Sequence, residues 1–172
     1  CDIHVKDIVQ TSSLVEVHRS SKNEGGAGGF TKGISIARKA KADWIWIMDD
    51  DGSPDYNALK ELLKAKKSIK NKSKIGALCC SVYEMGEYAY FHQKNYNFKF
   101  GIEKFVKLNS NQLNSNNCFD IDIASFVGLF ISSKAIKKIG LPIKEFFISH
   151  DDMEYSLRLK SKNFSIFLVP SS

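Results

Sequence analysis

The sequence lacks several features that would assign it directly to a class of protein. No apolar run reaches the roughly 20 residues that span a bilayer, and no signal peptide is visible. The spacing of the four cysteines fits neither a zinc site nor a disulfide framework. Cys79 and Cys80 lie in the apolar run IGALCCSV and are expected to be buried thiols. Free thiols favour a reducing, cytoplasmic location.

Other absences limit the ligands that can be expected. Aromatic residues are not interleaved with arginine in the manner of a nucleic-acid surface, so no nucleic-acid partner is expected. No two histidines stand at metal-ligand spacing. A glycine run at residues 25–29 is not followed by the Gly-Lys-Ser/Thr of a phosphate-binding loop, and it does not match the dinucleotide fingerprint.

The composition that remains is ordinary for one soluble globular domain. The chain has 172 residues, of which 43% are hydrophobic and 26% are charged, and this length can bury a core of useful size. It opens at Cys1 without an initiator Met and stops soon after an expected strand. We therefore expect a fragment that is truncated at both ends.

The charge balance is basic, with a formal net charge of +6. Lysines cluster in KKSIKNKSK, residues 66–74. This cluster is either a solvated helix end and loop, or a contact with an anionic surface such as lipid headgroups or a phosphorylated substrate. Peripheral contact with the inner face of a membrane is therefore one expectation.

The apolar pattern predicts alternating strands and helices in the first half of the chain. Strands are expected at 14–18, 43–48 and 74–82, with helices at 29–42 and 55–69. This alternation implies parallel strands with helices packed on the sheet, which is an α/β fold.

The second half of the chain departs from this alternation. Residues 87–101 are aromatic and polar without helical period and predict a hairpin. Strands are expected at 119–124, 126–132 and 164–169, with helices at 133–139 and from about Asp151. The expected fold is therefore a mostly parallel, Rossmann-like sheet flanked by helices, with a small antiparallel insertion.

Three consecutive carboxylates, Asp49, Asp50 and Asp51, follow the strand WIWIM and precede Gly52. Like charges at a strand end repel one another unless something offsets the repulsion, and a divalent cation is the usual candidate. Mg²⁺ and Mn²⁺ prefer oxygen ligands. Asp49 and Asp51 are the better pair, because alternate residues point to one side. The alternative is a solvated acidic turn that caps the next helix.

A second acidic group occurs in SHDDMEY, residues 149–155. A structural interpretation is available, because Ser149 and Asp152 match a capping box and Glu154 can pair with Arg158 four residues later. Near a metal–phosphate centre, however, one of these carboxylates could act as a general base toward a substrate hydroxyl.

The glycine run lies between an expected strand and an expected helix whose first turn is near Gly29 and Phe30. Such a loop exposes backbone N–H groups and lets a ligand approach closely. If the strands are parallel, this loop and the aspartates emerge at the same carboxyl edge of the sheet, where ligands bind in open α/β folds.

Together these stretches resemble family 2 glycosyltransferases of the GT-A fold, and most closely their galactofuranosyl- and rhamnosyltransferase branch. Three motifs carry the resemblance in order: NEGGAGGFTKGI (23–34), WIWIMDDDGSPDYNAL (44–59) with its Asp-x-Asp segment, and GLPIKEFFISHDDMEYSLR (140–158). The strand FVGLFIS (126–132) also fits. The resemblance covers about residues 14 to 170.

The resemblance implies an inverting transfer of a sugar from a nucleotide-sugar donor, of the UDP-galactofuranose or dTDP-rhamnose type, to a saccharide or polyprenyl-linked acceptor. Asp49 and Asp51 would bind Mg²⁺ or Mn²⁺, and Asp49 and Asp50 would contact the donor. Asp152 would be the catalytic base, with Asp151 as its rival.

The remaining implied contacts fall on both sides of the reacting sugar. Gly128 and Glu154 would lie on the acceptor side. The nucleotide side would be lined by Asn23, Gly25, Gly26, Gly28 and Gly29.

Two departures and two alternatives accompany this resemblance. The first strand of the family and the turn after its second strand are absent, and the chain ends before a histidine that often completes the metal site. MDDDGS also fits the nucleophile motif of haloacid-dehalogenase-type phosphatases, although that class places the motif on its first strand. A domain that binds a nucleotide-sugar without turnover is the other alternative.

Overall fold

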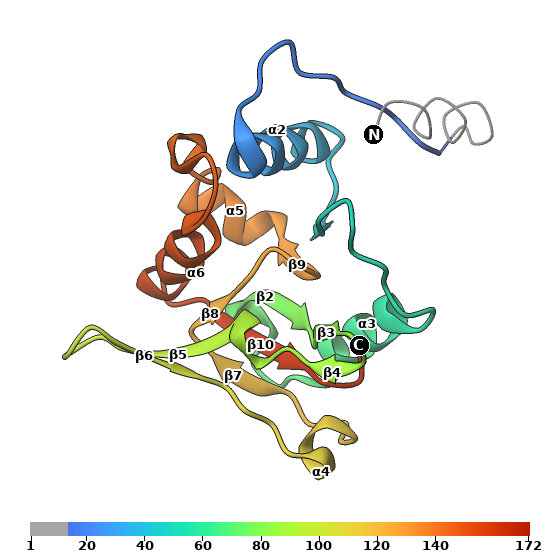
Figure 1. Cartoon of the computed structure of the whole chain (residues 1–172), viewed down its shortest axis with the longest axis vertical. Coiled ribbons are helices and arrows are strands. Elements are labelled where there is room, and N and C mark those ends of the chain that lie inside the picture. The colour runs from blue at the N-terminus through green and yellow to red at the C-terminus, as the bar shows by residue number, and fades with distance from the viewer. Residues whose placement is uncertain (1–13) are drawn as a thin grey trace.

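The structure is a computed structural model that describes residues 14–172 (Figure 1). Its centre is a five-stranded sheet with the strand order β1-β9-β2-β10-β7. These strands are β1 (Trp44–Ile47), β9 (Leu129–Ser132), β2 (Ile75–Cys80), β10 (Ser165–Val169) and β7 (Phe119–Ile121). The helices are α2 (Gly25–Lys39), α3 (Ala58–Ser68), α4 (Ser110–Leu113), α5 (Ser133–Ile139) and α6 (Asp151–Ser161).

The sheet is mixed, which corrects the expectation of a mostly parallel one. Strands β1, β2 and β10 run in one direction, but β9 lies antiparallel between β1 and β2, and β7 is antiparallel to β10. Only β2 and β10 are parallel neighbours among these five strands. The α/β class is confirmed, and the carboxyl ends of β1, β2 and β10 still point to one edge.

Helices cover both faces of this sheet, because successive residues of each strand point to opposite sides. On β2, Ala77 and Cys79 join a core with α2, α5 and α6, whereas Leu78 and Cys80 join a core with α3. Figure 1 shows the same division, with α2, α5 and α6 gathered apart from α3. The site-bearing elements are therefore fixed by apolar packing from two sides.

The predicted antiparallel insertion is confirmed. Strands β3 (Tyr83–Glu84) and β4 (Glu87–Tyr88) form one small sheet. Strands β6 (Ile102–Phe105), β5 (Gln93–Asn97) and β8 (Ile123–Ala124) form another. Three short 3₁₀ helices complete the described elements, η1 (Lys72–Lys74), η2 (Tyr90–His92) and η3 (Lys144–Phe146). In Figure 1 the β5–β6 hairpin extends away from the central sheet.

Two expectations for the amino-terminal part are wrong. Residues 14–18 form no strand, and none of the described strands pairs with this segment. Leu14 is 94% exposed. The alternation of apolar and polar residues there is therefore not used for burial. Helix α2 begins at Gly25 rather than near Gly29, so the glycine run belongs to the helix and not to a loop.

Within residues 14–172, no helix is both long enough and apolar enough to cross a membrane.

Candidate active site

Asp49, Asp50 and Asp51 lie directly beyond the carboxyl end of β1. Burial raises the pKa of Asp49, and the neighbouring charges of Asp51, Asp50 and Asp151 raise it further, while His92 acts in the opposite sense. The effect of Asp151 is informative, because that residue belongs to α6 and is far away in the sequence. The fold thus brings Asp151 near enough to Asp49 for its charge to raise the pKa of that carboxyl group.

A cavity of about 1040 Å³ opens beside these aspartates. It is lined by the segments that follow β1, β2 and β10, including Asp49, Asp51, Ser81 and Ser172. The expectation that the site lies at the carboxyl edge of the codirectional strands therefore agrees with the position of this cavity.

Gly128 also lines this cavity, at the start of β9. Its φ is +76°, and a Cβ there would lie 3.0 Å from the Cβ of Cys80. The Cys80 N–H donates to the Gly128 carbonyl at 3.3 Å. Glycine at this position lets β9 turn closely against the end of β2 and keeps the cavity wall free of a side chain.

The acidic pair heads α6, with Asp151 only 7% exposed and Asp152 partly buried. Burial is the main cause of the raised pKa of Asp152, and the charge of Asp151 raises it further. Two interactions lower this pKa: the Met153 N–H donates to the Asp152 carboxylate at 2.6 Å, and Lys94 supplies a positive charge. The capping-box expectation is wrong. The N-cap is His150, which has a left-handed backbone and makes no side-chain capping bond.

The turn before α6 has an unusual backbone. Phe147, Ser149 and His150 have φ values of 60°, 76° and 66°, a region that costs non-glycine residues energy. The Phe147 carbonyl accepts the N–H of Ala27 at 3.1 Å. A Cβ on Gly25 would lie 2.1 Å from that same carbonyl oxygen. The first turn of α2 therefore packs directly on the turn that presents Asp151 and Asp152.

The backbone N–H groups of Gly25 and Gly28 have partners inside the protein. Gly25 N–H donates to the Asn23 side chain at 3.0 Å, and Gly28 N–H donates to the Glu24 carbonyl at 3.2 Å. Gly28 faces a separate cavity of about 540 Å³ on the side of α2. Of the predicted site residues, Asp49, Asp51 and Gly128 line the aspartate cavity. The lining does not include the others: Asn23, Gly25, Gly26, Gly28, Gly29, Asp50, Asp151, Asp152 and Glu154.

The family model for "Glycosyl transferase family 2" matches residues 4–135. The chain belongs to glycosyltransferase family 2. The match covers the glycine run and the Asp-x-Asp segment, which removes the support for the phosphatase alternative. Residues 4–13 of the match lie outside the described residues.

Two curated relatives of the chain carry the name galactofuranosyltransferase GlfT1. The chain is 27% identical to galactofuranosyltransferase GlfT1 of Mycolicibacterium smegmatis (strain ATCC 700084 / mc(2)155) over 160 residues, which cover 92% of this chain and 52% of that protein. It is 26% identical to GlfT1 of Mycobacterium tuberculosis (strain CDC 1551 / Oshkosh) over 161 residues, or 92% of this chain and 51% of the relative. The chain thus spans about half the length of the curated relatives it matches.

A solved structure supports the fold. GalNAc-T7, crystallised with UDP, GalNAc and Mn2+, superimposes with a TM-score of 0.70 over 98% of this chain and 34% of the other, at 15% identity. Together with the family match, this likeness confirms the GT-A fold of the chain.

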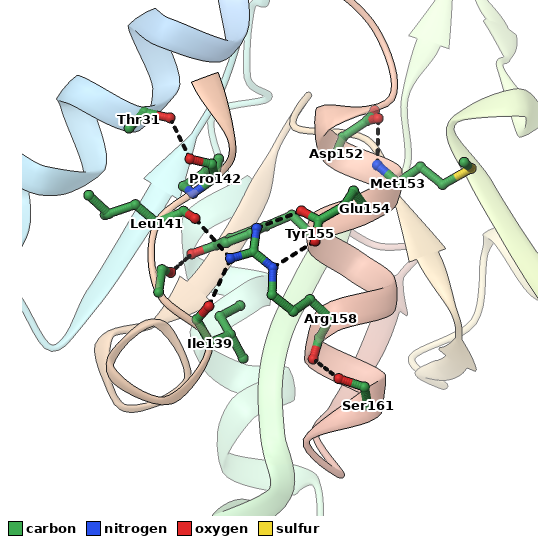
Figure 2. A network of polar contacts seen from close by, with 11 residues as sticks. Thr31, Ile139, Leu141, Pro142, Asp152, Met153, Glu154, Tyr155, Arg158 and Ser161 are labelled. Carbon is green, nitrogen blue, oxygen red and sulfur yellow. Dashed lines mark hydrogen bonds and ion pairs between the residues drawn. The ribbon is translucent and has the colours of Figure 1, made fainter. Parts of the chain in front are cut away.

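Glu154 takes part in a polar network that Figure 2 shows from close by. Its two carboxylate oxygens accept from Arg158 at 2.8 and 2.5 Å, as the spacing predicted. The Arg158 guanidinium also donates to the carbonyls of Ile139 and Leu141, and the Tyr155 hydroxyl donates to that of Gly140. The network ties α6 to the end of α5, so both oxygens of Glu154 are engaged in fixing the helix.

Three residues that line the aspartate cavity were not expected from the sequence. Tyr83, Glu84 and His92 come from the antiparallel insertion and line the wall of the aspartate cavity. No spacing signal could have identified these residues, because the insertion folds onto the cavity only through the topology of β3, β4 and η2.

The carboxylates that follow β1 have the donor chemistry that Mg²⁺ and Mn²⁺ prefer. Asp49 and Asp51 supply carboxylate oxygens, the ligand type that these cations prefer. Among residues 14–172 no group of three or more His, Cys, Asp or Glu side chains is arranged to hold a metal ion. Such cations are commonly held by one or two carboxylates plus substrate phosphates, so a diphosphate would complete the coordination.

Proposed function

We propose that the protein containing this chain transfers a sugar, with inversion, from a UDP-galactofuranose- or dTDP-rhamnose-type donor to a saccharide or polyprenyl-linked acceptor in cell-surface polysaccharide synthesis. The observation that carries the proposal is that Asp49 and Asp51, in the part of the chain matched by the family 2 model, line a large cavity beyond the carboxyl end of β1. The names of the curated relatives favour galactofuranose over rhamnose.

The donor diphosphate is assigned to the aspartate side of the cavity. Asp49 and Asp51 would hold Mg²⁺ or Mn²⁺, which neutralises charge on the departing diphosphate. Asp50 is exposed beside them and is proposed to contact the donor. Gly128, which leaves the wall free of a side chain, is proposed to face the transferred sugar or the acceptor.

Asp152 is proposed as the general base. A carboxylate whose pKa is raised by burial holds a proton more readily than an exposed one, which suits it to accept the acceptor hydroxyl proton. The hydroxyl oxygen attacks the anomeric carbon as the bond to the diphosphate breaks, so a single displacement inverts that centre. Asp151, which interacts more directly with Asp49, is the rival for this role.

The glycine run is proposed to support the base rather than to contact the nucleotide. The family resemblance implied donor contacts for Asn23, Gly25, Gly26, Gly28 and Gly29, but the close contact at Gly25 favours a role in holding the 147–150 turn. Glu154 is likewise proposed to act through Arg158 and α6 rather than on the acceptor.

The decisive experiment replaces Asp152 with Asn in the full-length protein, with Asp151→Asn beside it. Asp43→Asn is the matched control, because Asp43 is an exposed aspartate at the opposite end of β1. We expect Asp152→Asn to keep Mn²⁺-dependent UDP binding by calorimetry while sugar transfer falls about 10²- to 10⁴-fold, the usual contribution of a general base. Unchanged transfer in Asp152→Asn together with lost transfer in Asp151→Asn would reassign the base.

A peripheral position at the inner face of the cytoplasmic membrane is also proposed. Lys67, Lys70, Lys72 and Lys74 are exposed around the end of α3 and η1, and such clusters are attracted to anionic lipid. Replacing these four lysines with Gln should reduce sedimentation with vesicles that contain phosphatidylglycerol, and equal sedimentation of both proteins would contradict this contact.

A further inference from the structure

One wall of the aspartate cavity has a chemistry that the three motifs do not explain. Tyr83 and Glu84 of β3 and His92 of η2 line it, and all three come from the antiparallel insertion. The other residues discussed for catalysis come from the central sheet and α6. This wall is therefore built by a separate part of the chain.

His92 is held in one orientation on this wall. Its Nδ1 lies 2.8 Å from the Ser125 hydroxyl oxygen, and its Nε2 lies 3.2 Å from a carboxylate oxygen of Glu84. The His92 side chain is 14% exposed and that of Glu84 is 58% exposed. Glu84 thus keeps free accepting capacity toward the cavity while its position is fixed through the imidazole.

Tyr83 adds an aromatic surface next to this polar pair. It is 52% exposed, and its ring centroid lies 6.1 Å from that of Tyr88 on the paired strand. An aromatic face beside a small number of fixed polar groups is the usual composition of a small-molecule site, with the ring offering apolar contact and the hydroxyl a polar handle.

The charges that line the cavity restrict what this wall can bind. Within the described residues, the lining contains Asp49, Asp51, Asp55 and Glu84 but no lysine or arginine. An anionic ligand would therefore need a bound cation to offset its charge. The carboxylates of Asp49 and Asp51 are the groups in this lining that can hold such a cation next to the ligand. The wall around Glu84 instead favours a neutral ligand whose hydroxyl groups donate to a carboxylate.

We propose that Tyr83, Glu84 and His92 form the subsite for the neutral acceptor saccharide, with sugar hydroxyls donating to Glu84 and a sugar face lying against Tyr83. This inference rests on the proposed transferase function. It separates the cavity into a diphosphate side at the aspartates and a saccharide side on the insertion.

The test uses the full-length protein, UDP-galactofuranose and a synthetic galactofuranosyl disaccharide as acceptor. Glu84→Gln should raise the acceptor KM about tenfold or more, because a charge-assisted hydrogen bond is lost. Its Kd for UDP with Mn²⁺ should stay within about twofold, since the metal side is untouched. Tyr83→Ala should raise the acceptor KM similarly, whereas Tyr83→Phe keeps the ring and should stay near wild type.

The control is Glu87→Gln. Glu87 pairs with Glu84 across the β3–β4 hairpin and is exposed, but it does not line the cavity. We expect its acceptor KM and UDP Kd to match those of the wild type. An effect of Glu87→Gln as large as that of Glu84→Gln would point to damage of the hairpin and overturn the assignment.

The remaining outcomes separate this inference from the proposed function. If Tyr83→Ala weakens UDP binding and leaves the acceptor KM unchanged, the wall holds the nucleobase and the inference is wrong. If wild-type protein binds UDP with Mn²⁺ but shows no saturation-transfer NMR signal from the disaccharide, the subsite fails while donor binding stands. If the disaccharide signal is present and lost in Glu84→Gln but no transfer occurs, the proposed function fails and the subsite stands.

Discussion

Replacing Gly25 with Ala should destabilise the protein, although the residue lies in a helix where alanine is normally the better choice. The added Cβ would lie 2.1 Å from the Phe147 carbonyl oxygen and 2.7 Å from its carbon. Gly25 also has a φ of +66°. A left-handed backbone costs an L-residue about 1–2 kcal/mol, and forcing atoms into a packed contact costs about 1–3 kcal/mol.

These two costs together come to about 2–5 kcal/mol, a large part of the 5–15 kcal/mol that typically stabilises a domain. For a chain of this length, each kcal/mol corresponds to about 2–4 °C in Tm. We therefore expect the Tm of Gly25→Ala to fall by about 4–20 °C. Differential scanning calorimetry of the purified protein measures this directly.

The same helix provides controls of opposite sign. A Cβ on Gly29 or Gly33 would meet nothing within 4 Å, and both positions lie inside α2. Gly29→Ala and Gly33→Ala should therefore stabilise the protein by about 0.5–1 kcal/mol, the ordinary gain from alanine in a helix. If Gly25→Ala also stabilised the protein, the close approach to Phe147 and the argument built on it would be refuted.

The effect of Gly25→Ala on activity distinguishes two roles for the glycine run, support of the 147–150 turn and direct contact with the nucleotide. If the glycine run holds the 147–150 turn, Gly25→Ala should lower kcat, because Asp152 moves, while UDP binding changes little. A loop that contacted the nucleotide through bare backbone would behave differently, since alanine at Gly26 or Gly29 would then weaken UDP binding as well.

Two further predictions concern the site. In the presence of a chelator, Asp49→Asn should raise Tm at pH 7, because the folded-state pKa of Asp49 is raised above 3.8 and its ionised carboxylate therefore destabilises the folded state above that pKa. The gain in Tm should shrink as the pH falls toward 3.8 and the wild-type carboxyl group becomes protonated. A difference in Tm that did not depend on pH would contradict this. Arg158→Met should lower the free energy of unfolding by about 2 kcal/mol, because it removes charge-assisted bonds to Glu154 and leaves the Ile139 and Leu141 carbonyls without their donor. Glu154→Gln keeps an acceptor for Arg158 and should lower the free energy of unfolding by less. Urea denaturation of both variants measures the difference.

Local elements were predictable because their signals are local. The apolar run of β1, the apolar spacing of α3 and the glycine that ends α5 all lie within a few residues of the structure they specify. The position of β9 between β1 and β2 was not predictable in the same way. Strand order depends on contacts between distant segments, and the βαβ alternation of the first half gave no sign that a later strand would separate its neighbours.

The position of the cavity was predictable where a strand end fixes it, and the rest of its lining was not. Asp49 and Asp51 follow β1, and the carboxyl edge of codirectional strands is where a cavity was expected and where one lies. The wall of Tyr83, Glu84 and His92 has no motif, since residues of an insertion reach the cavity through tertiary packing alone. The glycine run was misjudged because glycine has low helix propensity, and tertiary contact can override a propensity of about 1 kcal/mol per residue.

The contact between Gly25 and Phe147 gives a physical reason for the glycine and acidic motifs to occur in one chain. The 147–150 turn holds three non-glycine residues at positive φ, and such residues persist only where surrounding structure imposes them. The Ala27 N–H and the bare face of Gly25 supply that constraint from α2. The Arg158 network supplies it from the other side by fixing α6 to the end of α5 (Figure 2). On this reasoning, glycine at position 25 is required by the geometry of the turn that precedes the acidic pair, and it would be required even if no nucleotide ever touched it.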